Sequence, residues 1–177
     1  IIPKKNDQFN IKKNSLLINF ERKYKKNYPV YIECRESKKK DIPQLKKITF
    51  EDSSNSRFTR DPLLSKKFKR DYRKEWLLNF FKKKRGDYLI VAYKKNIIMG
   101  FILIIKKSID SSFQIDLVVT AKKHQKKRVG TSLINYVNNH YMTKGEKIIA
   151  GTQTDNLKAI KMYKKLGFIK TKKVLYV

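Results

Sequence analysis

Two adjacent apolar runs, 88–93 and 97–105, constrain the fold of this chain more than any other feature. Only Lys94-Lys95-Asn96 separates them, a pattern typical of two strands joined by a tight hairpin. A third apolar strand follows at about Phe113–Val119. The longer run includes Gly100 and has nine residues, whereas a helix that spans a bilayer needs roughly 20 apolar residues. The sequence therefore predicts an antiparallel meander and no transmembrane segment.

Helical spacing of apolar residues recurs on both sides of this meander. Ile42, Leu45 and Ile48 follow Asp41 and predict a helix that begins near Pro43, with Asp41 as its N-cap. Further helices are predicted at 68–84, at 128–144 before Gly145, and from Asn156 to a stop at Gly167.

Short strands are predicted at Val30–Cys34 and 147–152, with one or two closing strands in 168–177. The resulting order predicts an α+β fold with a mixed, mostly antiparallel central sheet and helices on both faces. We assign residues 30–177 to this domain. Residues 1–29 form a polar lead-in with one apolar patch that fits either a docked helix or a disordered segment. The patch consists of Leu16, Leu17, Ile18 and Phe20.

The chain is strongly basic, with 44 Lys+Arg against 15 Asp+Glu and a formal net charge of +29. A dense cationic surface neutralises phosphates, so a nucleic-acid-binding module is one hypothesis. However, 36 of the cations are lysines spread along the chain, whereas proteins that read nucleic acids favour arginine. We therefore interpret most of the charge as a solvated surface and expect no specific nucleic-acid partner.

Cysteine and histidine are scarce, which bears on metals and on the redox compartment. The single cysteine, Cys34, excludes an intrachain disulfide framework, and His124 and His140 are too few for a histidine cluster. We expect no metal site and a cytoplasmic protein. Because the chain starts at Ile1 without a methionine and residues 1–13 lack a signal layout, we expect a trimmed N-terminus.

The first motif with chemical content joins the third meander strand to the next helix. Val118-Val119 ends the strand, and Gln125-Lys126-Lys127-Arg128-Val129-Gly130-Thr131 opens the helix. The free N–H groups and positive dipole end of a helix N-terminus suit a diphosphate. An ordinary lysine-rich loop fits this stretch equally well.

The second motif runs from Thr154 to Phe168, with Asn156 at a helix start, Ala159 one turn later, Tyr163 a further turn on, and Leu-Gly-Phe at the exit. Here the sequence resembles the GNAT superfamily of acetyl-CoA-dependent N-acetyltransferases, whose pattern is Asn-x-x-Ala-x-x-x-Tyr-x-x-x-Gly-Phe. The first motif resembles the pyrophosphate loop of that superfamily, Gln/Arg-x-x-Gly-x-Gly/Ala. The resemblance implies the GNAT-like acyl-CoA N-acyltransferase fold over residues 30–177.

The resemblance also implies how acetyl-CoA would bind. The backbone of the strand would hold the pantetheine arm and polarise the thioester carbonyl, and the loop would hold the diphosphate. The residues so implied are Leu117, Val118, Val119, Gln125, Lys126, Lys127, Arg128, Val129, Gly130, Thr131 and Asn156. Arg128 departs from the family pattern, because it stands where the first glycine is usual. An exposed side chain and a direct phosphate contact are both open to it.

By the same resemblance, Tyr163 would protonate the departing thiolate as general acid, a task that suits a phenol with a pKa near 10. A core aromatic on an amphipathic helix is the alternative for Tyr163. Asp116 lies on the strand that would carry a catalytic base, but we expect a solvent-facing or structural carboxylate. The base stays unassigned, and a water chain is one way to supply it.

The acceptor-binding residues should lie outside these motifs. A Ser- and Asp-rich loop with Arg57 and Phe58, followed by Tyr72 and Trp76, resembles the TDP-fucosamine acetyltransferase type of the superfamily. An arginine can bind a sugar diphosphate, and aromatic rings can pack on a deoxysugar. We therefore expect an anionic nucleotide-linked amino sugar as the acceptor. Alternatively, the aromatic residues belong to the core, and Arg57 bridges a nearby aspartate.

Other functions stay open at this point. Within enzymes, the alternative is an N-acetyltransferase that acts on a protein N-terminus or a lysine. An alternative of a different class is an inactive GNAT-like module that binds nucleic acid through its basic surface. The net charge and Arg128 at a usual glycine position support this alternative. A homodimer is compatible with either.

Overall fold

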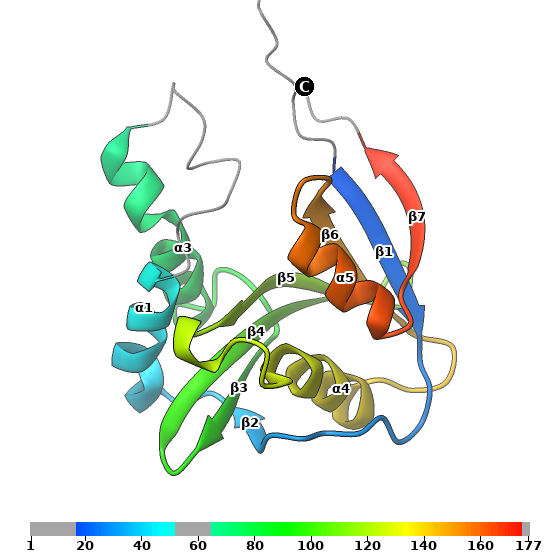
Figure 1. Ribbon diagram of the computed structural model, residues 1–177, viewed down its shortest axis with the longest axis horizontal. Coiled ribbons are helices and arrows are strands. Elements are labelled where there is room, and N and C mark those ends of the chain that lie inside the picture. The colour runs from blue at the N-terminus through cyan, green and yellow to red at the C-terminus, as the bar shows by residue number, and fades with distance from the viewer. Residues whose placement is uncertain (1–16, 52–64, 175–177) are drawn as a thin grey trace, which may run out of the picture.

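The computed structural model describes residues 17–51 and 65–174, which form one seven-stranded sheet flanked by helices (Figure 1). The sheet order is β2-β3-β4-β5-β6-β1-β7, and all described pairs are antiparallel except β5 with β6. The strands are β1 Leu17–Lys23, β2 Cys34–Glu36, β3 Tyr88–Lys94, β4 Ile97–Lys107, β5 Ser112–Thr120, β6 Lys147–Gln153 and β7 Ile169–Val174. The helices are α1 Ile42–Glu51, α3 Lys66–Phe81, α4 Val129–Tyr141 and α5 Leu157–Lys165. The predicted mixed, mostly antiparallel sheet is confirmed.

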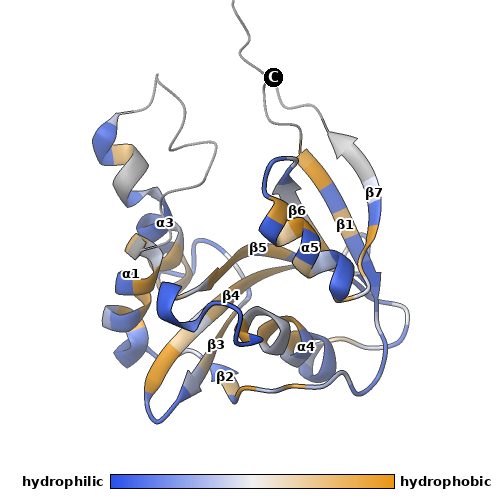
Figure 2. Cartoon of the chain, in the orientation of Figure 1, coloured by the Kyte–Doolittle hydropathy of each residue, from blue (hydrophilic) through white to orange (hydrophobic). Residues whose placement is uncertain are grey.

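The predicted hairpin is formed by β3 and β4, whose register pairs Lys94 with Ile97. The two residues of the turn, Lys95 and Asn96, have φ of 47° and 63°. Positive φ at both central residues is the geometry of a type I′ turn, whose twist matches that of the flanking strands. The apolar runs on either side thus enter the middle of the sheet, where Figure 2 shows their hydrophobic residues between more polar helices.

Helices cover both faces of the β3–β4–β5 region, as predicted. Alternate side chains of β3 divide between the faces, because successive residues of a strand point in opposite directions. Ile90 and Ala92 pack in the cluster that includes α4 and α5. Leu89 and Val91 pack in the cluster that includes α1 and α3. We call these two sides the α4/α5 face and the α1/α3 face.

The boundary predicted at residue 30 is wrong, because Leu17–Lys23 forms strand β1 inside the sheet, between β6 and β7. Ile18 and Phe20 are buried in the core, and residues 1–16 lie outside the described part of the chain. The third inward-facing residue of β1 is Arg22, which is only 3% exposed. Because this position is charged, the alternation of apolar and polar residues that indicates a strand is not visible in the sequence. Neither the docked helix nor the disordered segment applies to Leu17–Lys23.

Arg22 is accommodated by the helices of the α4/α5 face. Its Nη1 donates to Asn135 Oδ1 at 3.0 Å and to the Leu166 carbonyl at 3.1 Å. Its guanidinium carbon lies 4.0 Å from the ring centroid of Tyr28 and 5.1 Å from that of Phe168. Burial lowers the pKa of Arg22 to about 10. This arginine therefore ties β1 to the middle of α4 and to the C-terminal end of α5.

The strand predicted at Val30–Cys34 is displaced to Cys34–Glu36, which pairs with β3. The preceding segment bonds to polar side chains of α4 instead of to a strand. The backbone N–H groups of Tyr31 and Ile32 donate to Ser132 Oγ at 3.0 and 3.1 Å. Backbone groups that are satisfied by side chains leave no ladder to form, so the alternating pattern does not become a strand here.

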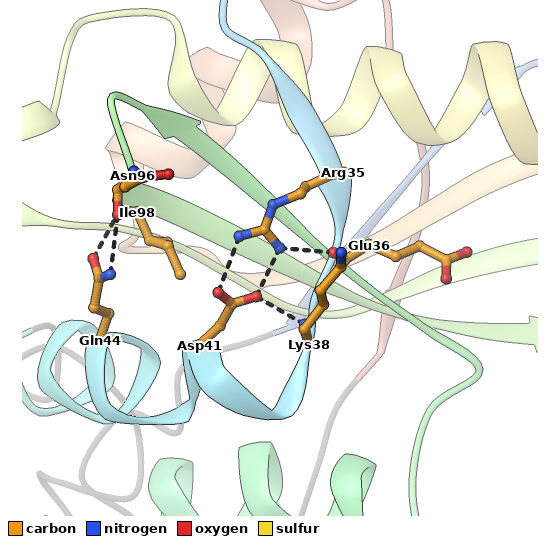
Figure 3. Close-up of polar contacts among 7 residues, drawn as sticks. All are labelled: Arg35, Glu36, Lys38, Asp41, Gln44, Asn96 and Ile98. Atoms are coloured by element: carbon orange, nitrogen blue, oxygen red, sulfur yellow. Dashed lines mark hydrogen bonds and ion pairs between the residues drawn. The ribbon is translucent and has the colours of Figure 1, made fainter.

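Helix α1 begins at Ile42, one residue from the predicted start, and its entry is fixed by Asp41 (Figure 3). The predicted N-cap role of Asp41 is wrong. Its carboxylate accepts from the Lys38 N–H at 2.7 Å, in the 3-10 turn that precedes α1. Arg35 donates to both Asp41 oxygens, at 2.7 and 3.0 Å, and this bond lowers the pKa of Asp41. The pair anchors α1 beside β2.

Gln44 makes a second anchor between α1 and the sheet (Figure 3). Its side chain accepts from the Ile98 N–H at 2.9 Å and donates to the Asn96 carbonyl at 3.1 Å. The amide therefore extends the hydrogen bonding of the β3–β4 hairpin onto the helix.

Candidate active site

Strands β5 and β6 separate in the middle of the sheet. They pair in parallel only along Ser112–Ile115, whereas β5 continues to Thr120 in its ladder with β4. The β4–β5 register shifts between Leu103 and Ile104, so Asp116 is an extra residue at the point of separation. Beyond Asp116, the edge of β5 that faces β6 pairs with none of the described strands. We call this opening the β5/β6 split; the two strands diverge in Figure 1.

The backbone direction of β5 follows from one hydrogen bond just beyond its end. The Ala121 N–H donates to the Met99 carbonyl at 2.9 Å, which sets the alternation along the ladder with β4. Leu117 and Val119 therefore direct their backbone groups to β4, and Val118 directs its own into the β5/β6 split. Among the three strand residues predicted to bind the pantetheine arm, Val118 is the one with this orientation.

The predicted diphosphate loop forms the N-terminus of α4. The cap residue Arg128 has φ 60° and ψ 17°, and no side chain caps the first turn, where Val129, Gly130 and Thr131 present their N–H groups. Lys126 also has a positive φ, 61°. Left-handed conformation costs a residue with a Cβ roughly 1–2 kcal/mol, which is why glycine is usual in such loops. At Arg128 the chain thus adopts the left-handed conformation without the glycine that is usual there.

The side chain of Arg128 stacks on Tyr31, with the guanidinium carbon 4.3 Å from the ring centroid. Ser132 joins the two residues, because its hydroxyl accepts from the Tyr31 N–H and donates to the Arg128 carbonyl at 3.1 Å. The Arg128 side chain is exposed, and a direct phosphate contact stays a prediction for it. A cation–π contact of this kind contributes about 0.5–1 kcal/mol at an exposed site, which offsets part of the backbone strain.

Helix α5 lies close to the N-terminus of α4. A Cβ added at Gly130 would lie 3.0 Å from Met162 Sδ, so the methionine side chain would have to shift slightly to admit a larger residue. The predicted N-cap of α5 is confirmed, since Asn156 Oδ1 accepts from the Ala159 N–H at 3.2 Å.

Tyr163 is 3% exposed and lies between two aromatic rings of the α4/α5 face. Its ring centroid is 5.7 Å from that of Phe20 and 5.2 Å from that of Phe168. Burial raises the pKa of the Tyr163 phenol well above its ordinary range. The expectation of a pKa near 10 is therefore corrected upwards, and the hydroxyl stays protonated at every pH in ordinary use.

The predicted acceptor residues Tyr72 and Trp76 lie on α3 in one aromatic row. Phe68 and Tyr72 stack at 5.9 Å, and Tyr72 meets Trp76 edge-on at 5.8 Å. One face of α3 borders a cavity of about 600 Å³, lined by Ser65, Lys67, Phe68, Asp71, Tyr72, Glu75, Trp76 and Asn79. Tyr72 is also 5% exposed, so it serves the core as well. The predicted Arg57 and Phe58 lie outside the described residues.

Sequence reasoning missed Arg85, which follows α3 and bonds to Asp116 at the β5/β6 split. Its Nε and Nη2 each donate to one Asp116 oxygen at 2.6 Å, and this bond raises the pKa of Arg85. Trp76 stacks on the same guanidinium, 4.5 Å from the ring centroid. Asp116 has a side chain only 5% exposed, so the expectation of a structural carboxylate is confirmed. The sequence feature that could have indicated Arg85 is that it is the one arginine after three lysines in the run 82–85.

Within residues 17–51 and 65–174, no three His, Cys, Asp or Glu side chains gather in a group that could hold a metal ion. No helix in the same ranges is both long enough and apolar enough to span a bilayer.

The mixed sheet with helices on both faces is the fold that the resemblance implied. The sequence matches the Acetyltransferase (GNAT) family over residues 49–168, more than half of the chain. The chain therefore belongs to the GNAT acetyltransferase family.

Known relatives are distant. The spore coat polysaccharide biosynthesis protein SpsD of Bacillus subtilis is 25% identical over 141 residues, which cover 79% of this chain and 48% of that protein. The chain thus spans about half the length of this curated relative. A GNAT acetyltransferase structure from Bacillus cereus aligns with a TM-score of 0.62 at 18% identity, over 82% of this chain and 87% of that one. For a ribosomal-protein-alanine N-acetyltransferase from Brucella melitensis the TM-score is 0.58 at 20% identity, over 80% and 86%.

Proposed function

We propose that this chain is an N-acetyltransferase that moves an acetyl group from acetyl-CoA to the primary amine of a nucleotide-linked amino-deoxy sugar. The observation that carries the transferase half of the proposal is the β5/β6 split, which opens between the uncapped N-terminus of α4 and the N-terminus of α5. Unpaired backbone groups of a strand and of a helix N-terminus would then serve the pantetheine arm and the diphosphate of CoA.

The residues around the β5/β6 split fit acetyl-CoA. The free N–H groups of Val129, Gly130 and Thr131 are directed at a diphosphate, beside the exposed cations Lys126 and Lys127. Gln125, Arg128 and the amide of Asn156 complete the rim, and Val118 offers backbone groups for the pantetheine arm. When bound, acetyl-CoA supplies the acetyl group on a thioester with a thiol as the leaving group.

Tyr163 is the proton donor in this proposal. Its phenol retains the proton because burial raises its pKa, and the proton goes to the thiolate sulfur as the carbon–sulfur bond breaks. The acceptor nitrogen forms the new bond to the acetyl carbon and loses one proton to solvent, from which Tyr163 regains its own. Asp116 does not serve as the base, since both of its oxygens are engaged by Arg85.

The acceptor half of the proposal rests on chemistry and on one relative. SpsD is named for polysaccharide biosynthesis, which favours a sugar. The aromatic row on α3 borders the cavity and can pack on the apolar side of a deoxysugar. A net charge of +29 attracts an anionic nucleotide sugar and repels a polyamine. Arg57 and Phe58 are further proposed contacts.

A panel assay tests both halves. TDP- and UDP-linked amino sugars and basic peptides are offered with acetyl-CoA, and release of the CoA thiol is measured. We expect turnover with a nucleotide sugar. Turnover with peptides alone would instead identify a protein acetyltransferase. No turnover, no rise in melting temperature with acetyl-CoA and steep salt-dependent retention on DNA would identify the nucleic-acid-binding module.

A further inference from the structure

A run of four cations, Lys82–Arg85, follows α3 on the α1/α3 face. The three lysines are exposed, and no carboxylate pairs with them within the described ranges. Arg85 differs from them, because Asp116 and Trp76 fix the direction of its guanidinium. The run therefore combines diffuse positive charge with one oriented arginine.

The orientation of Arg85 leaves donors available on one edge. Nε and Nη2 are used by the two oxygens of Asp116, whereas Nη1 has no hydrogen-bond partner in the described part of the chain. The side chain is 36% exposed. A planar guanidinium that is held on one edge presents its remaining N–H groups in a fixed direction, which is the form in which arginine recognises phosphate.

The position of Arg85 relates these donors to the proposed reaction. Asp116 is the extra residue at which β5 leaves β6, so its carboxylate brings Arg85 to the vertex of the β5/β6 split. Trp76, which stacks on the guanidinium, also lines the cavity along α3. The diphosphate loop of α4 packs with the opposite face, so Arg85 lies apart from the proposed CoA phosphates.

From this arrangement we infer that Arg85 recognises a phosphate group of the acceptor, with Lys82, Lys83 and Lys84 adding attraction for a polyanion. The inference rests on the proposed function and adds a specificity-determining residue to it. Asp116 is then a positioning residue, which aims the guanidinium and does not meet the acceptor.

Trp76 is the single tryptophan of the chain, so its fluorescence reports on the Arg85 guanidinium directly. The experiment titrates thymidine diphosphate into the full chain with CoA at saturation, which fills the other phosphate site. We expect a saturable change in the emission of the wild-type chain. A titration without CoA separates the two sources of phosphate binding, because only binding at the loop of α4 is removed by CoA.

Arg85→Met alone leaves a buried carboxylate unpaired, so the main variant is the charge-neutral pair Arg85→Met with Asp116→Asn. We expect its affinity for thymidine diphosphate to fall at least tenfold. The matched control is Arg35→Met with Asp41→Asn, which removes the other bidentate pair at the start of α1 and should leave the affinity unchanged.

The outcomes decide between the claims. Absence of a saturable change in the wild-type chain, or equal affinity in the Arg85 variant, would overturn the inference. Saturable binding without acetylation of any nucleotide sugar would overturn the proposed acceptor and leave phosphate recognition by Arg85 standing. Acetylation of nucleotide sugars with an unchanged KM in the Arg85 variant would overturn phosphate recognition by Arg85 and leave the proposed acceptor standing.

Discussion

The two faces of the sheet hold their functional residues by different means. On the α4/α5 face, backbone N–H groups, an N-cap and a left-handed loop form the proposed cofactor site. On the α1/α3 face, ion pairs and stacked aromatic rings form the proposed acceptor side. Backbone geometry demands particular residues at fixed spacing, whereas side-chain pairs can be built in many ways. The first face therefore leaves a motif in the sequence and the second does not.

The largest effect is expected on the α4/α5 face, for Tyr163→Phe. The substitution keeps the ring between Phe20 and Phe168 and removes only the hydroxyl. We expect kcat to fall about 100-fold, equivalent to about 2.7 kcal/mol, because a positioned acid contributes on this scale. The rise in melting temperature with acetyl-CoA should persist. Full turnover at every pH with normal acetyl-CoA binding would exclude the acid role.

The next effect is expected on the α1/α3 face, for Arg85→Met. The free energy of unfolding in urea should fall by about 2 kcal/mol, since the buried Asp116 carboxylate is left without this partner. Adding Asp116→Asn should recover most of the loss. Lys84→Met, at an exposed neighbour, should stay within about 0.5 kcal/mol of wild type. Equal stability of the single and double variants would contradict a stabilising pair.

The sequence predicted what depends on local pattern. The β3–β4 hairpin, the four helices and the capping of α5 by Asn156 each follow from residues within a few positions of one another. Strand β1 was missed, because Arg22 fills an inward position and finds its partner Asn135 far along the chain. The segment before β2 was misread for the same reason, since Ser132 of α4 takes its backbone N–H groups.

Prediction of the candidate site divides in the same way. The loop 125–131 and Tyr163 could be proposed as site residues from their spacing alone, although Arg128 stands where a glycine is usual. Arg85 was not identified, because its role depends on Asp116, 31 residues away, and on a register shift that no local pattern reveals. Pairing of this kind is a tertiary property.

A smaller effect concerns the buried phenol of Tyr163 and alkaline pH. Its pKa is raised in the folded chain, whereas an unfolded tyrosine ionises near pH 10. Above pH 10 only the unfolded chain loses this proton, so stability is full below pH 10 and falls as the pH rises further. The loss should reach about 1.4 kcal/mol at pH 11. Urea unfolding at pH 9 and 11 should show a smaller loss for Tyr163→Phe, and an identical loss would disprove the assignment.

The smallest effect concerns whether the left-handed backbone conformation of Arg128 lowers the stability of the chain. Glycine there removes the cost of a left-handed Cβ, roughly 1–2 kcal/mol, and also the contact with Tyr31, about 0.5–1 kcal/mol. Because glycine also carries a backbone-entropy cost of about 0.5–1 kcal/mol, we expect the free energy of unfolding of Arg128→Gly to stay close to that of the wild type. Lys127→Gly is the matched control, because Lys127 has no positive φ, and it should lose about 0.5–1 kcal/mol. If both glycines destabilise the chain equally, the left-handed conformation at Arg128 is not strained. If only the control does, the loop retains the glycine geometry at a cost that the Tyr31 contact partly offsets.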